Sequence, residues 1–508
     1  MKRLSLQPYH LFEYRGMSFA ADTEKLTFIR LDPISRDLLG DLVAGASLGA
    51  AATRLEATHG AQAAEHAIAE YLTLRQNGYL KGPVLTYDAR DYERLTARVL
   101  KMATGTIELY LAEACNMRCR YCYANTNDAL GSGLMSWDVA RAAVDLVFRR
   151  AVDVDIMQIT FFGGEPLLNK PVMGQVIEYS QQLAKQHNKT MRYSLTTNAT
   201  LLDDQVIDWI KRYNFGLMIS ADGPPAVHDD MRPMADGRGS FGIMSPKVKE
   251  LMRRRRQVTA RCTVSNRHLN LYEIVTFLEQ FGFTRVGLST CQGKSYHLGP
   301  FDVGPERKAE METQLDLLMD RWIDQVKKGE PLCYDPYTSS IHSFHSKRTR
   351  APMLHCGVCR GCTTVGVDGS LYPCHRYVGM KNYVIGTVWD GVDDTKHADY
   401  LRQYFKTKEK CESCWAINFC GGMCVWYVSH EDGTCRPPEG WRCDSVRRWI
   451  EKTAWIYERV REECPEFVGR IAKEYDEAAL VAEGKPTETR TDNATSGHSN
   501  QSLDQTAT

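Results

Sequence analysis

The segment TIELYLAEACNMRCRYCYA, residues 106–124, joins a strand-like run to three closely spaced cysteines. Its first seven residues are mostly apolar and contain β-branched and aromatic side chains, which is typical of a buried strand. Cys115, Cys119 and Cys122 follow in a CxxxCxxC spacing. Three thiolates on one short loop can hold three irons of a four-iron cluster and leave the fourth iron open. A structural zinc site is the alternative, but it usually pairs one CxxC with another.

Five more strand-like runs follow, with amphipathic helical stretches such as 136–152 and 173–188 between them. These runs are MQITFFG (157–163), RYSLTTN (192–198), FGLMISA (215–221), VTARCTV (258–264) and RVGLSTC (285–291). The alternation predicts parallel βα units with functional loops at the carboxyl ends of the strands. Six units are too few for a closed eightfold barrel. We therefore expect an α/β fold built on an open partial (β/α)6 barrel at residues 101–350.

The flanking regions differ from this pattern. Residues 10–21 and 24–32 predict a hairpin, and three short helical stretches between 35 and 80 complete a winged-helix-like domain at residues 1–100. From the pattern alone, this region is equally well explained as a packing or dimerisation appendage. Residues 351–470 are rich in cysteine and predict a fold organised around metal. The polar end of the chain, residues 471–508, is expected to be disordered.

Composition excludes several classes of protein. Hydrophobic residues make up 43% of the 508 residues and charged residues 25%, which is ordinary for a globular chain. Lys+Arg and Asp+Glu both number 63, so no net charge draws the protein to nucleic acid or to an anionic membrane. The amino terminus lacks the apolar core of a signal peptide. We expect a cytoplasmic protein whose 17 cysteines stay reduced and serve as metal ligands before disulfides.

Three further motifs follow the cysteine loop in order: FFGGEPLL (161–168), LTTNAT (195–200) and ISADGPPAVHDDMRP (219–233). Together with the cysteines they resemble the radical S-adenosylmethionine (SAM) enzymes. The resemblance implies that Cys115, Cys119 and Cys122 hold a 4Fe-4S cluster whose open iron binds SAM. The residues implied to contact SAM are Tyr121 and Gln292 at the adenine, Gly163, Gly164 and Glu165 at the methionine amino group, Ser220 and Arg232 at the carboxylate, and Asn198 after the third strand.

A second set of cysteines lies in HCGVCRGCTTVGVDGSLYPCHRY (355–377) and CESCWAINFCGGMC (411–424). This region resembles the SPASM extension of peptide-modifying radical SAM enzymes, which implies two auxiliary 4Fe-4S clusters and three clusters in all. The implied ligands are Cys356, Cys362, Cys374 and Cys424 for the first and Cys411, Cys414, Cys420 and Cys443 for the second. Six cysteines remain: Cys262, Cys291, Cys333, Cys359, Cys435 and Cys464. Cys359 or Cys435 could replace a neighbouring ligand, and the spacing also satisfies two four-thiolate zinc sites.

The SPASM-like phrases are most similar to those of maturases that form thioether bonds in peptides, such as the SCIFF-peptide maturases and the maturation protein of quinohemoprotein amine dehydrogenase. The resemblance implies a polypeptide substrate held by the amino-terminal domain and an external one-electron donor. It also implies a cross-link from cysteine sulfur to a carbon of Asp or Glu. Anaerobic sulfatase-maturating enzymes, which oxidise Ser or Cys to formylglycine, are the alternative. They carry Asp directly after the cysteine that corresponds to Cys374, whereas this chain has His375.

A substrate thiol must lose a proton, so a base is expected near the mouth of the barrel. Asp236, in the loop after the fourth strand, is the candidate, with Asp229 and Asp230 as rivals. Asp222 is assigned to its own turn or to the SAM ribose, and His375 to a cluster sulfur. Two non-enzyme alternatives remain: an electron-transfer protein with three clusters, and a zinc-scaffolded binding module.

Overall fold

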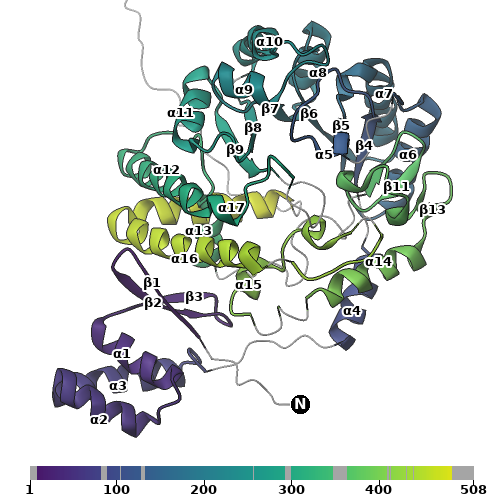
Figure 1. Cartoon of the computed structure of the whole chain (residues 1–508). Coiled ribbons are helices and arrows are strands. Elements are labelled where there is room, and N and C mark those ends of the chain that lie inside the picture. The colour runs from purple at the N-terminus through teal and green to yellow at the C-terminus, as the bar shows by residue number, and fades with distance from the viewer. Residues whose placement is uncertain are drawn as a thin grey trace, which may run out of the picture.

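The computed structural model describes most of the chain as helices, strands and connecting loops (Figure 1). The described residues are 9–81, 89–102, 105–126, 132–255, 257–291, 299–346, 363–408, 411, 414–430, 432–438 and 440–482. Gln292, Cys356, Cys359 and Cys362 lie outside these ranges.

Six parallel strands form the centre of the molecule. They are β4 (Thr106–Ala112), β5 (Ile156–Gly163), β6 (Thr190–Thr197), β7 (Gly216–Ser220), β8 (Thr259–Val264) and β9 (Arg285–Thr290). They pair side by side in chain order. This confirms the α/β fold with six consecutive βα units. Parallel order requires a crossover after each strand, and the amphipathic segments between the runs supply it.

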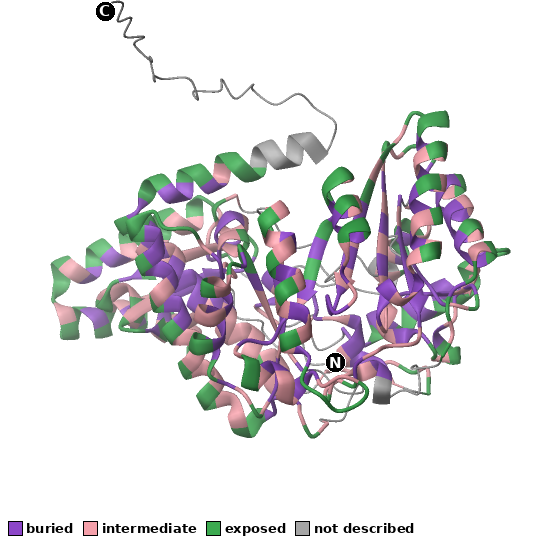
Figure 2. Ribbon diagram, turned by 90° about the horizontal axis from the view of Figure 1, so that it is seen from above, coloured by how far each residue is buried: buried purple, intermediate pink, exposed green. Residues whose placement is uncertain are grey.

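Helices cover the outer face of these strands. They are α6 (Trp137–Arg150), α7 (Lys170–Gln186), α8 (Asp204–Arg212), α9 (Pro225–Met231), α10 (Phe241–Arg254), α11 (Leu271–Phe281) and α12 (Lys308–Lys328). Side-chain caps fix where several of them begin: Ser136 accepts a hydrogen bond from the Val139 amide, and Asp203 from the Val206 amide. Figure 2 shows buried residues on the strands and on the helix faces turned toward them, which form one large apolar core.

The carboxyl-terminal region extends the same sheet. β10 (Thr363–Val365) pairs in parallel with β4, and three short antiparallel strands continue from it. These are β11 (Ser370–Tyr372), β12 (Gly386–Thr387) and β13 (Gly391–Val392). The cysteine-rich region therefore joins the barrel at β4, the strand that leads into the first cysteine loop.

The amino-terminal region contains a three-stranded antiparallel sheet and three helices. The strands are β1 (His10–Tyr14), β2 (Met17–Asp22) and β3 (Thr27–Leu31), and the helices are α1 (Pro33–Val43), α2 (Leu48–His59) and α3 (Ala61–Gln76). The expected hairpin is present, with a third strand added to it.

Helix α4 (Ala89–Leu100) packs against α14 (Asp394–Lys406) of the cysteine-rich region (Figure 1). The rings of Tyr92 and Phe405 stack at 5.7 Å between centroids. Arg402 also pairs with Glu93 at 3.0 Å. The segment between the amino-terminal sheet and the barrel is thus anchored on the cysteine-rich region.

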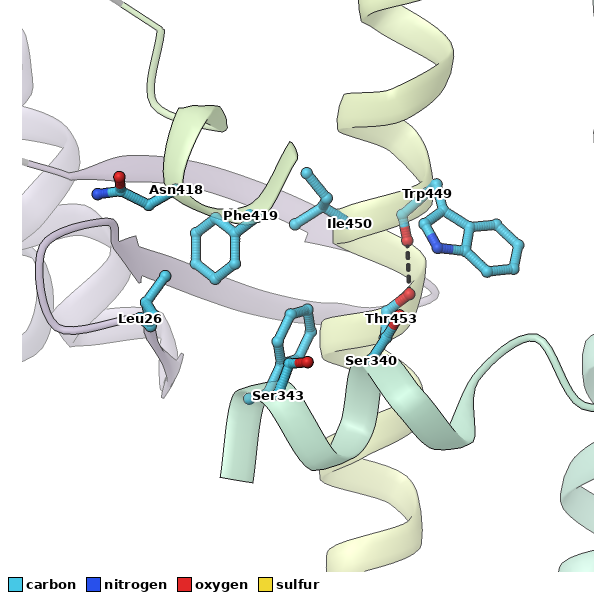
Figure 3. A pocket seen from close by; sticks show the side chains of 9 residues that line it. Leu26, Ser340, Ser343, Asn418, Phe419, Trp449, Ile450 and Thr453 are labelled. Atoms are coloured by element: carbon cyan, nitrogen blue, oxygen red, sulfur yellow. Dashed lines mark hydrogen bonds between the residues drawn. The ribbon is translucent and has the colours of Figure 1, made fainter. Parts of the chain in front are cut away.

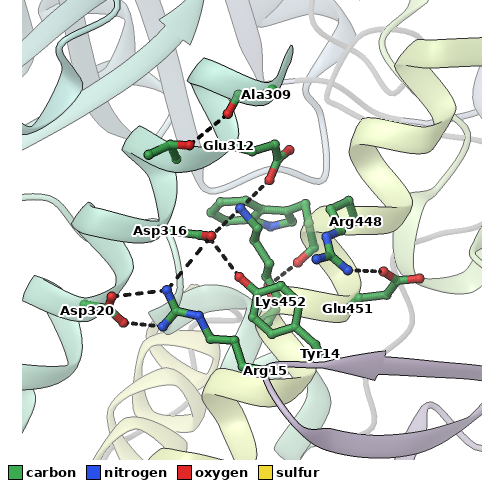
Figure 4. A network of polar contacts seen from close by, with 12 residues as sticks. Tyr14, Arg15, Ala309, Glu312, Asp316, Asp320, Arg448, Glu451 and Lys452 are labelled. Carbon is green, nitrogen blue, oxygen red and sulfur yellow. Dashed lines mark hydrogen bonds and ion pairs between the residues drawn. The ribbon is translucent and has the colours of Figure 1, made fainter.

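A buried lysine on α16 (Gly440–Glu463) ties the amino-terminal sheet to the barrel (Figure 4). The Lys452 side chain is 2% exposed and forms ion pairs with Glu312 and Asp316 of α12. The hydroxyl of Tyr14, at the end of β1, donates to Asp316 at 2.8 Å, and the neighbouring Arg15 pairs with Asp320. Burial of a charge is tolerated here because two carboxylates surround it.

A small cavity of about 30 Å³ lies at the same junction, bounded by Leu26, Asn418 and Trp449 among others (Figure 3). The side-chain amide of Asn418 donates to the Thr23 carbonyl at 2.9 Å, whereas its buried Oδ1 has no hydrogen-bond partner among the described residues. The volume and the polar lining suit a single bound water.

The other helices are α5 (Tyr123–Thr126), α13 (Thr338–His345), α15 (Ile417–Cys420), α16 and α17 (Pro465–Ala482). Because α17 continues to Ala482, the expectation of disorder from residue 471 is wrong for 471–482. The face of α17 that carries Phe467, Val468 and Ile471 is buried against α12 and α16, and this packing holds the helix in place. Residues 483–508 lie outside the described ranges. No helix among the described residues is both long and apolar enough to cross a membrane.

Candidate active site

A cavity of about 470 Å³ opens at the carboxyl ends of the parallel strands. It brings together the described residues that the sequence assigned to the first cluster and to SAM. These are Cys115, Cys119, Tyr121, Cys122, Gly163, Gly164, Glu165, Asn198, Ser220 and Arg232. The first and the last of them, Cys115 and Arg232, are 117 positions apart in the sequence, so the fold rather than local sequence gathers them.

The first cysteine loop places its thiols close to one another inside this cavity. The pKa of Cys115 and that of Cys119 are both raised to about 12. Burial is the main cause, and the charges of the nearby thiols contribute to the rise. Arg118 and Arg120 fasten the loop: the Arg118 guanidinium donates to the Cys115 carbonyl at 2.7 Å, and the Arg120 amide to the Met231 carbonyl at 3.0 Å.

Buried thiolates need a cation to offset their charge, so this donor set fits an iron–sulfur cluster bound through three sulfurs. Within the described ranges, no three His, Cys, Asp or Glu side chains are gathered as the ligands of a single metal ion.

Two glycines let the end of β5 pack onto the start of the cysteine loop. Gly163 has φ +146°, and a Cβ there would lie 2.5 Å from the Ala112 carbonyl oxygen. A Cβ on Gly164 would lie 2.4 Å from the Ala114 carbonyl oxygen. In their place the Gly164 amide donates to Ala112 at 2.7 Å. The glycines are therefore required by contact between two segments of the protein itself.

Glu165 is 1% exposed and organises the next turn. Its carboxylate accepts hydrogen bonds from the Leu167 amide (3.1 Å), the Thr197 hydroxyl (2.7 Å) and the Asn198 amide (2.8 Å). Burial is the larger influence and raises the pKa of Glu165 to about 7, whereas the three hydrogen bonds lower it. Three of about four acceptor positions are thus occupied, which leaves one for a ligand ammonium.

The motif after β7 forms a buried hub around Asp222, which is 1% exposed. Its carboxylate accepts from Arg232 Nε at 2.9 Å and Nη2 at 3.2 Å, from the Tyr121 hydroxyl, and from the Thr263 amide at 2.9 Å. The Arg232 guanidinium lies 5.3 Å from the centre of the Tyr121 ring. Asp222 therefore fixes both Tyr121 and Arg232, and leaves Arg232 only its remaining N–H groups for a ligand.

His228 supports the hub from behind. The Asp222 amide donates to His228 Nδ1 at 3.3 Å, and His228 Nε2 lies 3.1 Å from the hydroxyl of Ser240. That hydroxyl donates onward to the Arg232 carbonyl at 2.6 Å. With Nδ1 as an acceptor, the ring is neutral, and burial lowers the pKa of His228 to about 4.

This depressed pKa predicts an acid-sensitive contribution to stability. The unfolded chain binds a proton near pH 6.5 that the folded ring excludes, so stability is complete above pH 6.5 and falls as the pH falls toward 4. Linkage gives a loss of about 2 kcal/mol between pH 8 and pH 5. Urea unfolding of the native protein and of His228→Gln at both pH values measures it. The gap between the two proteins should narrow at pH 5, and a gap that stays constant would contradict the linkage.

The candidate base Asp236 lies outside the residues that line the cavity. Its side chain is 51% exposed and pairs with Arg238 at 2.7 Å, and these hydrogen bonds lower the pKa of the carboxyl. A surface carboxylate held by a guanidinium is a poor acceptor for a proton released inside the cavity. The rivals are also engaged elsewhere: Asp229 accepts from the Phe241 amide at 2.7 Å, and Asp230 lies 2.8 Å from His268 Nε2. The prediction that Asp236 faces the site is therefore wrong.

Glu108, Arg261 and Arg376 line the cavity but were not singled out from the sequence, and His375, which was assigned to a cluster sulfur, lies there with them. His375 Nδ1 lies 3.1 Å from Glu108 Oε1, and its ring stacks on Phe162 at 4.4 Å. Glu108 also accepts from the Thr364 hydroxyl of β10 at 2.9 Å. Glu108 is a charged residue inside the otherwise apolar run TIELYLA (106–112), and this feature of the sequence could have singled it out.

Some of the described auxiliary cysteines lie near others of the same assigned set. The Cys424 thiol lies close enough to raise the pKa of Cys374, and Cys414, Cys420 and Cys443 do the same for Cys411. In both cases burial is the larger cause. This grouping fits the interleaved ligand sets, which remain a prediction because Cys356 and Cys362 lie outside the described residues.

Two neighbouring side chains bear on these sets. Cys435 lies 3.9 Å from the Ser429 hydroxyl, and no other thiol is among the leading influences on its pKa. Lys408 is buried beside Cys411 and Cys420, and its ammonium donates to the Gly422 carbonyl. The leftover cysteines Cys262, Cys291, Cys333 and Cys464 are all buried, and Cys291 lies at the edge of the cavity.

Comparisons with known proteins agree with this geometry. Residues 109–240 match the radical SAM superfamily. The cysteine-type anaerobic sulfatase-maturating enzyme of Clostridium perfringens (strain 13 / Type A) is 24% identical over 339 residues, which cover 62% of this chain and 86% of that protein. The radical SAM cyclopropyl synthase TigE of Paramaledivibacter caminithermalis is 20% identical over 399 residues, 72% of this chain and 79% of that protein.

The fold agrees as well. The solved structure of native anSMEcpe with bound AdoMet superposes with a TM-score of 0.61 at 21% identity and covers 70% of this chain and 99% of that one. Residues 109–240 therefore match a radical SAM domain, and the α/β fold around them is the one seen in the solved structure of anSMEcpe.

Proposed function

We propose that this protein forms thioether cross-links, from cysteine sulfur to a carbon of Asp or Glu, in a ribosomally made polypeptide, with the small subunit of quinohemoprotein amine dehydrogenase as the substrate. The observation that carries the proposal is the cavity in which the cysteine loop meets the Gly-Gly-Glu turn at residues 163–165, Ser220 and Arg232. This is the arrangement that SAM-dependent hydrogen abstraction requires, beside a second cysteine-rich region.

The proposed cofactors are SAM and three 4Fe-4S clusters. Cys115, Cys119 and Cys122 would hold the cluster that binds SAM, with the auxiliary sets as assigned from the sequence. With SAM and a reduced cluster in place, the site supplies a 5′-deoxyadenosyl radical. A cavity of about 470 Å³ has the size of a small-molecule site. Glu165 has one acceptor position left for the methionine ammonium.

The amino-terminal sheet offers a place for the polypeptide. β3 is an edge strand of that sheet, and a groove of about 170 Å³ lies between β3, α1 and α3. Its lining includes Leu31, Leu38, Tyr71 and Leu74. An extended peptide can add to such an edge through backbone hydrogen bonds, with apolar side chains in the groove. A solved structure of anSMEcpe contains both AdoMet and the Kp18Cys peptide, so that relative binds a peptide.

The proposed reaction balances as follows. One hydrogen atom of a substrate C–H bond ends in 5′-deoxyadenosine, and the thiol proton goes to solvent. The sulfur–carbon bond forms, and one electron leaves the substrate. The auxiliary cysteines would hold the acceptor for that electron, and an external donor supplies the electron that SAM cleavage consumes.

Formylglycine formation is the second candidate, because the matched relatives include anaerobic sulfatase-maturating enzymes. The feature that favours cross-linking is His375, which stands where the sulfatase-maturating enzymes are expected to carry Asp. In this chain, that position is joined to Glu108 and stacked on Phe162 at the cavity wall.

Anaerobic turnover with SAM and dithionite distinguishes the candidates. The reconstituted enzyme is given the dehydrogenase subunit, the same subunit with Asp and Glu replaced by Asn and Gln, and a cysteine-containing sulfatase peptide. We expect 5′-deoxyadenosine together with loss of two hydrogens and one free thiol in the natural subunit alone. Replacement of sulfur by oxygen in the sulfatase peptide would establish formylglycine formation instead. Absence of 5′-deoxyadenosine in every reaction would refute both.

A further inference from the structure

Two guanidinium groups that face the cavity have no carboxylate partner in the described part of the chain. Arg261 lies on β8, and Arg376 follows Cys374 in the cysteine-rich region. Among the described residues, no Asp or Glu forms an ion pair or a hydrogen bond with either side chain. Arg232, which lines the same cavity, contrasts with both because Asp222 neutralises it.

Aromatic rings hold Arg376 in a fixed position. Its guanidinium carbon lies 5.2 Å from the centre of the Tyr123 ring and 5.5 Å from that of Trp426. Stacking engages the faces of the guanidinium plane and leaves the N–H groups at its edge available. One of them, Nη1, is buried and has no hydrogen-bond partner within the described structure. A buried donor left unsatisfied is costly, so a ligand acceptor at this point would be stabilising.

Arg261 lies near this group. Burial lowers its pKa, and the positive charges of Arg376 and Arg232 lower it further. Two like charges in a poorly solvated cavity destabilise each other, and a bound anion relieves that repulsion.

The two carboxylates that line the cavity do not pair with Arg261 or Arg376. Glu108 is engaged by His375 and by a hydroxyl, and Glu165 by three hydrogen bonds of its own turn. Among the described residues, no carboxylate therefore pairs with the positive charge on the side of the cavity formed by β8 and the cysteine-rich region.

We propose that Arg261 and Arg376 bind the side-chain carboxylate of the substrate residue that becomes cross-linked, and so select Asp or Glu over Asn, Gln and apolar residues. The inference rests on the proposed function and names its specificity site. A planar carboxylate matches the edge of a guanidinium in a paired hydrogen-bond geometry, and contact with both arginines fixes its direction. The methylene groups next to the carboxylate are then held inside the cavity, where hydrogen abstraction takes place.

The test measures binding of two capped tripeptides, acetyl-Gly-Glu-Gly-amide and acetyl-Gly-Gln-Gly-amide, to the reconstituted holoenzyme with SAM present. Calorimetry should show that the native protein binds the glutamate peptide at least about tenfold more tightly than the glutamine peptide. This ratio corresponds to the free energy of one charge-assisted hydrogen bond. Arg261→Met and Arg376→Met should each remove most of this preference. Arg376→Lys should keep part of the preference, because the positive charge remains but the paired N–H donors of the planar guanidinium are lost.

Arg253→Met is the matched control, since Arg253 lies on the outer surface and pairs with Glu250. It should bind both peptides as the native protein does. Thermal melts of all variants, and cluster absorbance, check that each one folds and carries its iron.

Three results would overturn the inference. Equal binding of the two peptides to the native protein would remove the carboxylate site. Weaker SAM binding in the arginine variants, with the peptide preference intact, would show that the two arginines bind the carboxylate of SAM and not that of the substrate. A change confined to the reduction potential of a cluster would assign the arginines to charge compensation of that cluster. Because 5′-deoxyadenosine is measured in the same preparations, its absence would count against the proposed function alone.

Discussion

Replacing Cys119 by alanine is expected to abolish 5′-deoxyadenosine formation, with a loss of at least about a thousandfold, since no chemistry in the cavity can cleave SAM without the cluster. With the proposed three clusters, iron should fall from about twelve to about eight per chain if the auxiliary clusters stay in place. Cys119 is the member of the loop whose thiol lies beside both Cys122 and Arg232. The measurements are iron content, absorbance and product chromatography on anaerobically purified protein.

Cys464→Ala is the control for this prediction. Cys464 is buried in the packing of α12, α16 and α17, away from the cavity. Its removal should leave iron content and SAM cleavage at the native level. Retention of full iron and SAM cleavage by Cys119→Ala would exclude the loop as the cluster site.

Asp222→Ala is expected to destabilise the barrel by about 3–5 kcal/mol, because it leaves the buried Arg232 charge without its partner. The two side chains are 1% and 8% exposed. Tyr121 loses its acceptor in the same substitution, and so does the Thr263 amide on β8. The change should therefore also lower SAM affinity, even in the fraction of protein that remains folded.

Asp236→Ala is the matched control for Asp222→Ala, because Asp236 is exposed whereas Asp222 is buried. Asp236 forms the same kind of ion pair, with Arg238, but on the surface, where solvent screens it. Urea unfolding should show no measurable change for this variant and a large one for Asp222→Ala. Equal effects of the two substitutions would show that the Asp222 hub does not support the fold.

The sequence predicted the barrel because its signals are local. A run of buried side chains with amphipathic helices between successive runs determines six parallel units, and the motif residues follow the strand ends directly. For the same reason, Ser220 and Glu165 could be placed at the cavity before any contact was known. Asp236 was misplaced for a different reason. A position after a strand shows at which end of the sheet a residue lies, but it does not show whether that part of a long loop faces the cavity or the solvent.

The local pattern alone thus determined six βα units, their order and the residues at their carboxyl ends. Tertiary structure decided what each polar side chain contacts there. His375 meets Glu108 across 267 residues of sequence because β10 joins the sheet beside β4. Arg376 enters the cavity through the same pairing, and Arg261 faces it from β8. Periodicity states which face of a segment is buried, but the identity of the partner depends on distant segments that meet only when the chain folds.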